Sequence, residues 1–347
     1  PLYARQSSLE RHQMGNDPMN EQPLVSIGVP VAKCVYLREA LACWTKQTYK
    51  NFEVLLSDDA APGDVRGAVE PYLGDARFTY VRQEVNSAPH FTRNWNACLE
   101  RAKGKYFVLA SDDDLYAPNF LERMVALAET HPEGNIFFAS WTMLTRRGAD
   151  GWVRTPVAQR RDWESAITFL YHRYALGMRI VAPPVLVRTE ALRAIGGFAD
   201  LPAAWFSDDL TWARLAQRGG VFFEPALLVD FRMAGQNVTM SKAARWVREK
   251  FAAVDAYEHE ILPLTHSLPA TNEADRLRKA WLTSGLPRWL ERHRQELAWD
   301  LPFHKALPFY LKRLMRGGGI TINTFLFSLT RVCSRRVRVL FRALRRR

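Results

Sequence analysis

The sequence is poor in cysteine and lacks any long apolar run. Its four cysteines, Cys34, Cys43, Cys98 and Cys333, are scattered and show no CxxC spacing. This pattern argues against a disulfide framework or a zinc site and favours a reducing compartment. No stretch approaches the roughly 20 apolar residues that a membrane-spanning helix needs. Residues 1–22 are polar, without the apolar core of a signal peptide, and we expect a flexible leader there.

Acidic residues are absent from residues 301–347, which hold twelve lysines and arginines. The whole chain has 48 basic and 36 acidic residues and a formal net charge of +12. Because this last segment accounts for the entire excess, residues 1–300 are formally neutral. A chain that is basic throughout would indicate nucleic-acid binding. The uneven distribution instead predicts a neutral catalytic body with a basic tail and no nucleic-acid partner.

The basic tail has the pattern of an amphipathic helix over residues 329–347. Apolar side chains recur there at three- and four-residue steps, and eight arginines from Arg331 to Arg347 fill most of the other positions. Such a helix is typical of proteins that lie on an anionic bilayer. We therefore expect a cytoplasmic protein held peripherally at the inner face of the cell membrane. The alternative interpretations are a solvated helix that packs on the body and a nucleic-acid-binding tail, although the tail has few interleaved aromatic residues.

Strand and helix patterns alternate over the first part of the chain. The expected strands are 24–31, 52–56, 78–82, 106–110 and 135–143, and the expected helices are 35–46, 64–73, 91–102 and 118–130. Such alternation predicts an α/β fold with a mostly parallel, Rossmann-like sheet flanked by helices. We assign this domain to residues 23–240. A helical C-terminal region follows over 241–347, with loops expected at 263–269 and 317–319.

Two acidic clusters follow strands of this predicted sheet. Asp58 and Asp59 end the second strand, and residues 112–114 (DDD) follow the fourth. Because ligands on such sheets bind beyond the carboxyl ends of strands, both clusters are expected at one edge. Adjacent carboxylates suit Mg²⁺ or Mn²⁺, and an ion there would hold a diphosphate. The alternatives are turn residues for the first cluster and a helix-capping loop for the second.

Short motifs occur in a fixed order over about residues 23–235. They are 25–30 (VSIGVP), 47–49 (QTY), 57–59 (SDD), 94–96 (NWN), 111–115 (SDDDL), 196–198 (GGF) and 208–209 (DD) followed by Arg214. No single motif is specific, but the ordered set resembles the inverting, nucleotide-sugar-dependent glycosyltransferases of family 2, which have the GT-A fold. Members of that family build bacterial surface polysaccharides and lipopolysaccharides, among other products.

The resemblance implies a nucleotide-sugar site on the first strands. Pro30 and its neighbours would line the base. Asp59, with Asp58 beside it, would accept a hydrogen bond from a uracil-type imide, which favours a UDP or dTDP donor. Arg93 and Lys103 are basic residues that could neighbour the diphosphate.

The resemblance also implies a metal site on the triple-Asp motif. Asp112 would lie near the ribose and the metal, and Asp113 with Asp114 would hold a Mn²⁺ or Mg²⁺ ion on the diphosphate. Many members place a histidine ligand further along the chain, where this sequence has Ala234. The predicted metal shell is therefore less complete than in those members.

A catalytic base is implied at the start of the predicted helix 208–217. Asp208 matches the family's base, and Asp209 competes with it for that role. A carboxylate that removes the acceptor's proton, without a covalent intermediate, inverts the anomeric centre. The alternative for this pair is a structural role at the helix N-terminus, where negative charge interacts favourably with the helix dipole.

We therefore predict an inverting glycosyltransferase that moves a sugar from a nucleotide donor to a saccharide or lipid-linked glycan. A weakened, glycosyltransferase-like binding protein is one alternative. A sugar-phosphate nucleotidylyltransferase is another, although residues 30–33 (PVAK) lack the glycine-rich loop that such enzymes need.

Overall fold

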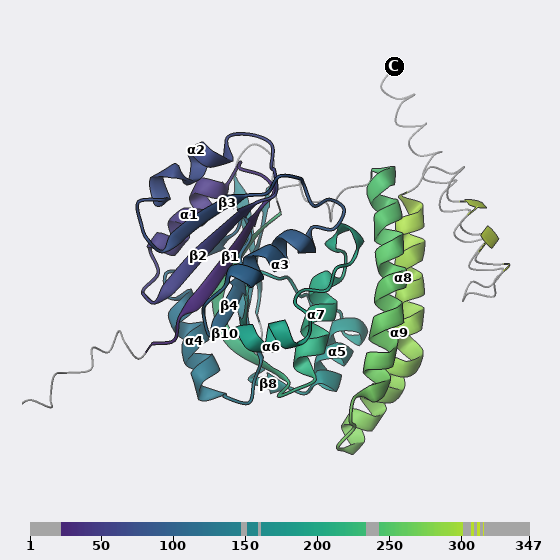
Figure 1. Ribbon diagram of the computed structural model, residues 1–347. Helices are drawn as coiled ribbons and strands as arrows, with labels where there is room; N and C mark the ends of the chain where they lie inside the picture. Colours follow the sequence, from purple (N-terminus) through teal and green to yellow (C-terminus); the bar gives the residue numbers. More distant parts are fainter. Residues whose placement is uncertain are drawn as a thin grey trace, which may run out of the picture.

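The computed structural model describes residues 22–146, 151–158, 161–233 and 243–300, together with residues 307, 308, 311, 312 and 315. These residues form one mixed sheet flanked by helices, and a hairpin of two long helices that packs beside it (Figure 1). Residues 1–21 of the predicted leader and the predicted tail helix 329–347 lie outside the described residues. Within the described part of the chain, no helix is both long enough and apolar enough to cross a membrane.

One half of the sheet is parallel, as the alternating pattern predicts. Its strands are β3 (Phe78–Arg82), β2 (Phe52–Asp58), β1 (Val25–Val31) and β4 (Tyr106–Leu109), in that spatial order. The connecting helices are α1 (Leu37–Thr45), α2 (Val65–Val69) with the 3₁₀ turn η2 (Glu70–Tyr72), and α3 (Thr92–Arg101). Strands β1, β2 and β4 are almost entirely buried, as expected for parallel strands covered by helices on both faces, whereas the edge strand β3 is largely exposed. Their carboxyl ends meet at one edge, which places both acidic clusters there.

The other half of the sheet is mixed. Strand β9 (Val185–Arg188) runs antiparallel between β4 and β6 (Ile136–Arg146), whereas β10 (Val221–Met233) runs parallel to β6. The short strands β5 (Leu115–Tyr116), β7 (Trp152–Val157) and β8 (Trp163–Glu164) pair antiparallel. The helices here are α4 (Phe120–Thr130), α5 (Ala166–Ala175), α6 (Thr189–Ala194) and α7 (Ser207–Ala216), with the 3₁₀ turn η3 (Pro202–Ala204). The predicted parallel arrangement thus ends at β4, and the α/β class is confirmed with a mixed sheet.

The core has one layer on each face of the sheet. Val25, Ile27 and Val29 of β1 pack with α1 and α4 on one face. On the other face, a Cβ atom at Gly28 would lie 2.6 Å from the Phe107 ring, which leaves no space for any larger residue there. Glycine at this position therefore lets α3 and its neighbours pack closely against the sheet.

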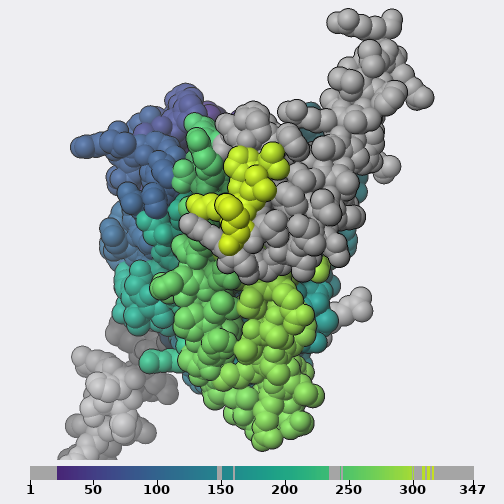
Figure 2. Space-filling view, turned by 90° about the vertical axis from the view of Figure 1, so that its right-hand side faces the viewer, coloured from purple at the N-terminus to yellow at the C-terminus, as the bar shows by residue number. Residues whose placement is uncertain are grey.

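The C-terminal hairpin consists of α8 (Ala244–Ser267) and α9 (Glu273–Trp299), which form one face of the molecule (Figure 2). Leu282, Leu286 and Leu290 of α9 are fully buried in the same core layer as α5 and α7. The predicted loop at 263–269 is wrong in its first part, because α8 continues through Pro263 to Ser267. Pro263 is exposed, so its ring lies on the solvent side of the helix, where a local distortion is tolerated.

Candidate active site

The triple-Asp motif follows β4 at the carboxyl edge of the sheet. Oδ2 of Asp112 accepts hydrogen bonds from the backbone N–H groups of Ala32 and Lys33, both at 2.8 Å. Those two residues follow β1, which pairs in parallel with β4, so the sheet itself brings the groups together. Burial, followed by the nearby Asp113 charge, raises the pKa of Asp112 to about 7.

The side chain of Lys33 contacts two carboxylates of this acidic motif. The Nζ atom of Lys33 is 2.5 Å from Oδ2 of Asp113 and 3.9 Å from Oδ1 of Asp112. The other oxygen of Asp113 accepts a hydrogen bond from Ser111 Oγ at 2.5 Å. Burial lowers the pKa of Lys33, but the charges of Asp112 and Asp113 outweigh it, and the net shift is upward. The ammonium group therefore stays charged beside the motif at neutral pH.

Asp114 faces a different strand. Its Oδ1 accepts a hydrogen bond from the backbone N–H of Arg232 on β10 at 2.7 Å, and its Oδ2 is buried with no hydrogen-bond partner among the described residues. Burial, followed by the Asp113 charge, raises the pKa of Asp114 well above its usual range. The Arg232 guanidinium lies 4.0 Å from the centre of the Tyr36 ring and pairs with Glu39 at 2.9 Å.

The oxygen atoms of this motif are not arranged as a set of ligands. Asp112 accepts from two backbone groups, Asp113 from Ser111 and Lys33, and Asp114 turns toward β10. In the part of the chain that the structure describes, no three Asp, Glu, His or Cys side chains are placed to hold one metal ion. Ala234 lies outside that part. This arrangement does not confirm the divalent ion that the sequence predicts on residues 112–114.

The second acidic cluster, at the end of β2, has two carboxylates with different surroundings. Asp58 is fully buried, and its carboxylate accepts from Ala61 N at 2.8 Å and from Tyr80 Oη and Arg82 Nη1 at 2.6 Å each. These contacts tie the loop after β2 to β3. Pro30 of β1 lies opposite Ser57 in the parallel register, next to this cluster.

Asp59 lies between the end of β1 and the loop after β3. Its backbone N–H donates to Val31 O at 2.9 Å, and its carboxylate accepts from the backbone N–H and hydroxyl of Ser87 at 2.9 and 2.8 Å. Burial raises the pKa of Asp59, although the bonds from Ser87 oppose the shift. Asp59 is therefore bonded to Val31 at the end of β1, and Lys33 follows Val31 by two residues in the sequence.

Arg93 lies in the segment that connects Asp59 to the candidate base. Its side chain is 65% exposed, and its Nε lies 3.3 Å from Oδ2 of Asp200. Nearby, the backbone N–H of Ala203 donates to Pro89 O at 2.7 Å. The loop that holds Asp59 thus also contacts the segment before α7.

Asp208 and Asp209 begin α7 but have different surroundings. Asp209 is buried and accepts from Nε and Nη2 of Arg173, on α5, at 2.6 and 3.3 Å. Asp208 is half-buried, and its Oδ1 accepts only from the backbone N–H of Asp209, at 3.0 Å, among the described residues. Burial, followed by the Asp209 charge, raises the pKa of Asp208 to about 7. Of the two, Asp208 has the carboxylate that can accept a proton near neutral pH.

An aromatic cluster from the C-terminal hairpin supports the start of α7. Phe206 has a left-handed backbone, with φ of 64°, and its ring stacks on Tyr257 of α8 at 4.8 Å. Trp289 and His293 of α9 lie 5.8 and 5.2 Å from the Phe206 ring. Burial, followed by the charge of Arg173, lowers the pKa of His293 to about 4, so this imidazole is neutral. The hairpin therefore fixes the backbone that presents Asp208.

No direct hydrogen bond or ion pair joins Asp208 to residues 112–114 in the described structure. Residues 86–93 contact Asp59 at one end and the segment before α7 at the other. The structure therefore brings Asp59 and the triple-Asp motif to one edge of the sheet. Asp208 lies on the other side of the loop that follows β3, at the start of α7.

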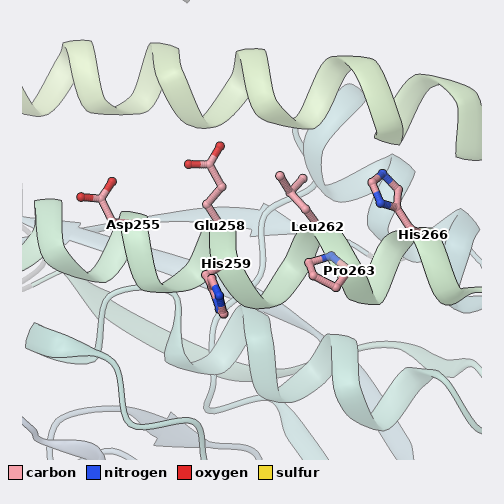
Figure 3. Close-up of a pocket in the computed structure, with 6 residues that line it drawn as sticks. All are labelled: Asp255, Glu258, His259, Leu262, Pro263 and His266. Carbon is pink, nitrogen blue, oxygen red and sulfur yellow. The ribbon is translucent and has the colours of Figure 1, made fainter. Parts of the chain in front are cut away.

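A hollow of about 490 Å³ lies along α8, away from all the predicted site residues. Its lining includes Asp255 and Glu258, which point toward α9 (Figure 3). Both side chains pair with Arg294 of α9, so their charges hold the hairpin together. We assign no ligand to this hollow.

Comparison with known proteins finds sequence similarity to glycosyltransferases. The model of the glycosyl transferase family 2 matches residues 26–186. The chain is 25% identical over 205 residues to the putative glycosyltransferase EpsE of Bacillus subtilis, covering 58% of this chain and 69% of that protein. It is 24% identical over 221 residues to an uncharacterized glycosyltransferase of Rickettsia prowazekii, covering 62% of this chain and 66% of that protein. A putative colanic acid biosynthesis glycosyl transferase of Escherichia coli, WcaA, is 31% identical over 112 residues, which are 31% of this chain and 39% of that protein.

Solved structures share the architecture at low sequence identity. Residues 1–349 of TarS from S. aureus, in complex with UDP-GlcNAc, superpose with a TM-score of 0.58 at 14% identity, covering 81% of this chain and 82% of that one. The mannosyltransferase PcManGT of Pyrobaculum calidifontis, in complex with GDP-Man and Mn²⁺, gives a TM-score of 0.53 at 16% identity, with 91% and 88% covered. The fold is that of the GT-A glycosyltransferases, and the comparisons together support a glycosyltransferase.

Proposed function

We propose that this protein is an inverting glycosyltransferase, which moves a sugar from a nucleoside-diphosphate donor onto a hydroxyl of a saccharide or lipid-linked glycan. The observation that carries the proposal is the position of Asp59 and residues 112–114 at one edge of a GT-A sheet. One relative supports a place in surface polysaccharide or lipopolysaccharide synthesis, since it is named for colanic acid biosynthesis.

The nucleoside is proposed to bind over the ends of β1 and β2. Pro30 and Asp59 would contact the base. Asp58 would hold the loop after β2 in place through its hydrogen bonds to β3. An imide of uracil or thymine complements a carboxylate acceptor, which favours UDP or dTDP. Arg93, exposed at the start of α3, is proposed to lie beside the donor on its outer side.

Asp208 is proposed as the base, with Asp209 as a positioning residue. In the transfer step, the acceptor hydroxyl oxygen forms a bond to the anomeric carbon as its proton passes to Asp208. The bond from that carbon to the diphosphate oxygen breaks, and the electron pair leaves with the nucleoside diphosphate. Arg173 holds Asp209 in two hydrogen bonds, so Asp209 has no equivalent freedom to accept that proton.

A Mn²⁺ or Mg²⁺ ion on residues 112–114 remains a prediction. The neighbour PcManGT was solved with Mn²⁺, which is a property of that protein. Because the oxygen atoms here are arranged around Lys33 and backbone N–H groups, we assign no step to a metal.

Membrane contact through residues 329–347 is likewise a proposal, and it rests on the sequence. The arginine-rich pattern suits the anionic inner face of the cell membrane, where each basic residue contributes on the order of 1 kcal/mol. A lipid-linked acceptor would then be presented to the enzyme on the cytoplasmic side.

The test is release of nucleoside diphosphate from a panel of nucleotide sugars, with water or added saccharides as acceptors. We expect release from at least one UDP- or dTDP-sugar, and loss of donor binding in Asp59→Ala. Tight donor binding without any release would favour the weakened binding protein. Formation of pyrophosphate from a nucleoside triphosphate and a sugar phosphate would instead indicate a nucleotidylyltransferase. If no nucleotide binds or reacts, the proposal is wrong.

A further inference from the structure

We propose that Lys33 acts as an internal cation that binds the diphosphate of the donor, so that donor binding does not require a divalent ion. This inference rests on the proposed function, which it deepens by assigning a residue to the leaving group. It concerns a side chain that lies in none of the motifs matched in the sequence.

The backbone around Lys33 is fixed by the acidic motif. The N–H groups of Ala32 and Lys33 both donate to one oxygen of Asp112, which holds the chain just after β1 against the end of β4. The ammonium group then reaches Asp113 at 2.5 Å and lies 3.9 Å from Asp112. Lys33 therefore provides, as part of the chain, a positive charge in direct contact with these carboxylates.

Lys33 is also accessible from the edge of the sheet. Its side chain is 22% exposed, whereas those of Asp112 and Asp113 are 6% and 5% exposed. Arg232, the other cationic residue bonded to this motif among the described residues, has a side chain only 3% exposed. A ligand that approaches the edge thus meets the ammonium group before it meets the carboxylates.

The position of Lys33 suits a diphosphate that extends from a nucleoside at Asp59. Asp59 N–H bonds to Val31 O, and Lys33 follows Val31 by two residues, so both lie at the end of β1. A diphosphate brought beside three carboxylates needs a positive charge facing it. When the bond to the sugar breaks, the electron pair stays on the diphosphate oxygen, and the ammonium group stabilises that charge.

The experiment measures binding of UDP, dTDP and GDP to the full-length protein by isothermal titration calorimetry, in EDTA and in MnCl₂. The variants are Lys33→Met and Lys33→Arg, with Lys105→Met as the matched control. Lys105 is also an ion-paired lysine, 2.6 Å from Glu129, but it lies at the opposite end of β4. Thermal unfolding of each variant checks that the fold is retained.

For the native protein we expect the same affinity for the nucleoside diphosphate in EDTA and in MnCl₂. Lys33→Met should bind about tenfold to a hundredfold more weakly in EDTA, which corresponds to one lost hydrogen bond to a charged group. Lys33→Arg should retain binding in EDTA, and Lys105→Met should match the native protein. Electron paramagnetic resonance of Mn²⁺ should show tighter Mn²⁺ binding to Lys33→Met than to the native protein, because Asp113 loses its internal partner.

Three results would overturn the inference while leaving the proposed function intact. They are binding by the native protein only in MnCl₂, binding in EDTA by Lys33→Met as tight as by Lys105→Met, and equal Mn²⁺ affinity of Lys33→Met and the native protein. A native protein that binds none of the three nucleotides under either condition contradicts the proposed function, and the inference with it.

Discussion

Replacing Asp208 by asparagine tests the assignment of the base. Asparagine keeps an oxygen that can accept the hydrogen bond from Asp209 N–H, so the start of α7 should be preserved. What is lost is the carboxylate whose pKa is raised to about 7. Because a positioned general base contributes about 10²- to 10⁴-fold, donor turnover should fall by that factor. Donor affinity should hardly change, since Asp208 makes no direct contact with residues 112–114 in the described structure.

The pH profile of donor turnover gives the second readout. The deprotonated form of Asp208 is the one that accepts a proton, so kcat/KM of the native protein should rise with pH and level off above about 7. Asp208→Asn should lose this rise. Initial rates of nucleoside diphosphate release across pH 5 to 9 would be measured for each variant, and calorimetry would supply donor affinity.

Asp209→Asn is the matched control. It keeps Asp208 but removes the neighbouring charge that raises the pKa of Asp208, so the profile midpoint should move below 7 while turnover persists at higher pH. It also leaves the buried Arg173 charge uncompensated, and stability should fall by about 3–5 kcal/mol. Normal turnover by Asp208→Asn, with loss of turnover in a folded Asp209→Asn, would show that the two roles are reversed.

Three further perturbations test the fold and the tail. Gly28→Ala should destabilise the protein by about 1–3 kcal/mol in chemical unfolding, because the added methyl group meets the Phe107 ring, and unchanged stability would contradict the close packing described. Asp64→Ala should cost about 0.5–2 kcal/mol, since Asp64 caps α2 by accepting from Gly67 N–H; a neutral result would mean that water replaces the cap. Removal of residues 317–347 should release the protein from anionic liposomes, and undiminished co-sedimentation would refute the proposed membrane contact.

The parallel half of the fold was predictable because its signals are local. Strands β1 to β4 are short apolar runs bounded by polar residues, and Asp64 provides a clear helix start. The direction of β9 was not predictable, because it depends on which side of the sheet the chain enters after α5. The loop prediction at Pro263 was wrong because a proline on the solvent-exposed face of a helix can be tolerated. Which face of α8 is exposed depends on its packing against α9.

The acidic residues of the candidate site were predictable from the sequence, and their basic partners were not. Lys33 and Asp113 are 80 residues apart and meet only because β1 lies next to β4 in the sheet. Arg173 and Asp209 are 36 residues apart, and Arg173 lies on α5, which the sequence pattern did not mark as a helix. Clustered carboxylates indicate a candidate site in the sequence, whereas a single cation can be assigned to that site only when the fold is known.

We propose that the carboxyl edge of the sheet binds a nucleotide sugar. A crystal structure of the protein with a UDP- or dTDP-sugar, or with the nucleoside diphosphate that binds best, tests it most directly. We predict a base beside Pro30 and Asp59, a diphosphate in contact with Lys33, and a sugar that faces Asp208. A nucleotide bound at another surface, such as the hollow along α8, would contradict the account.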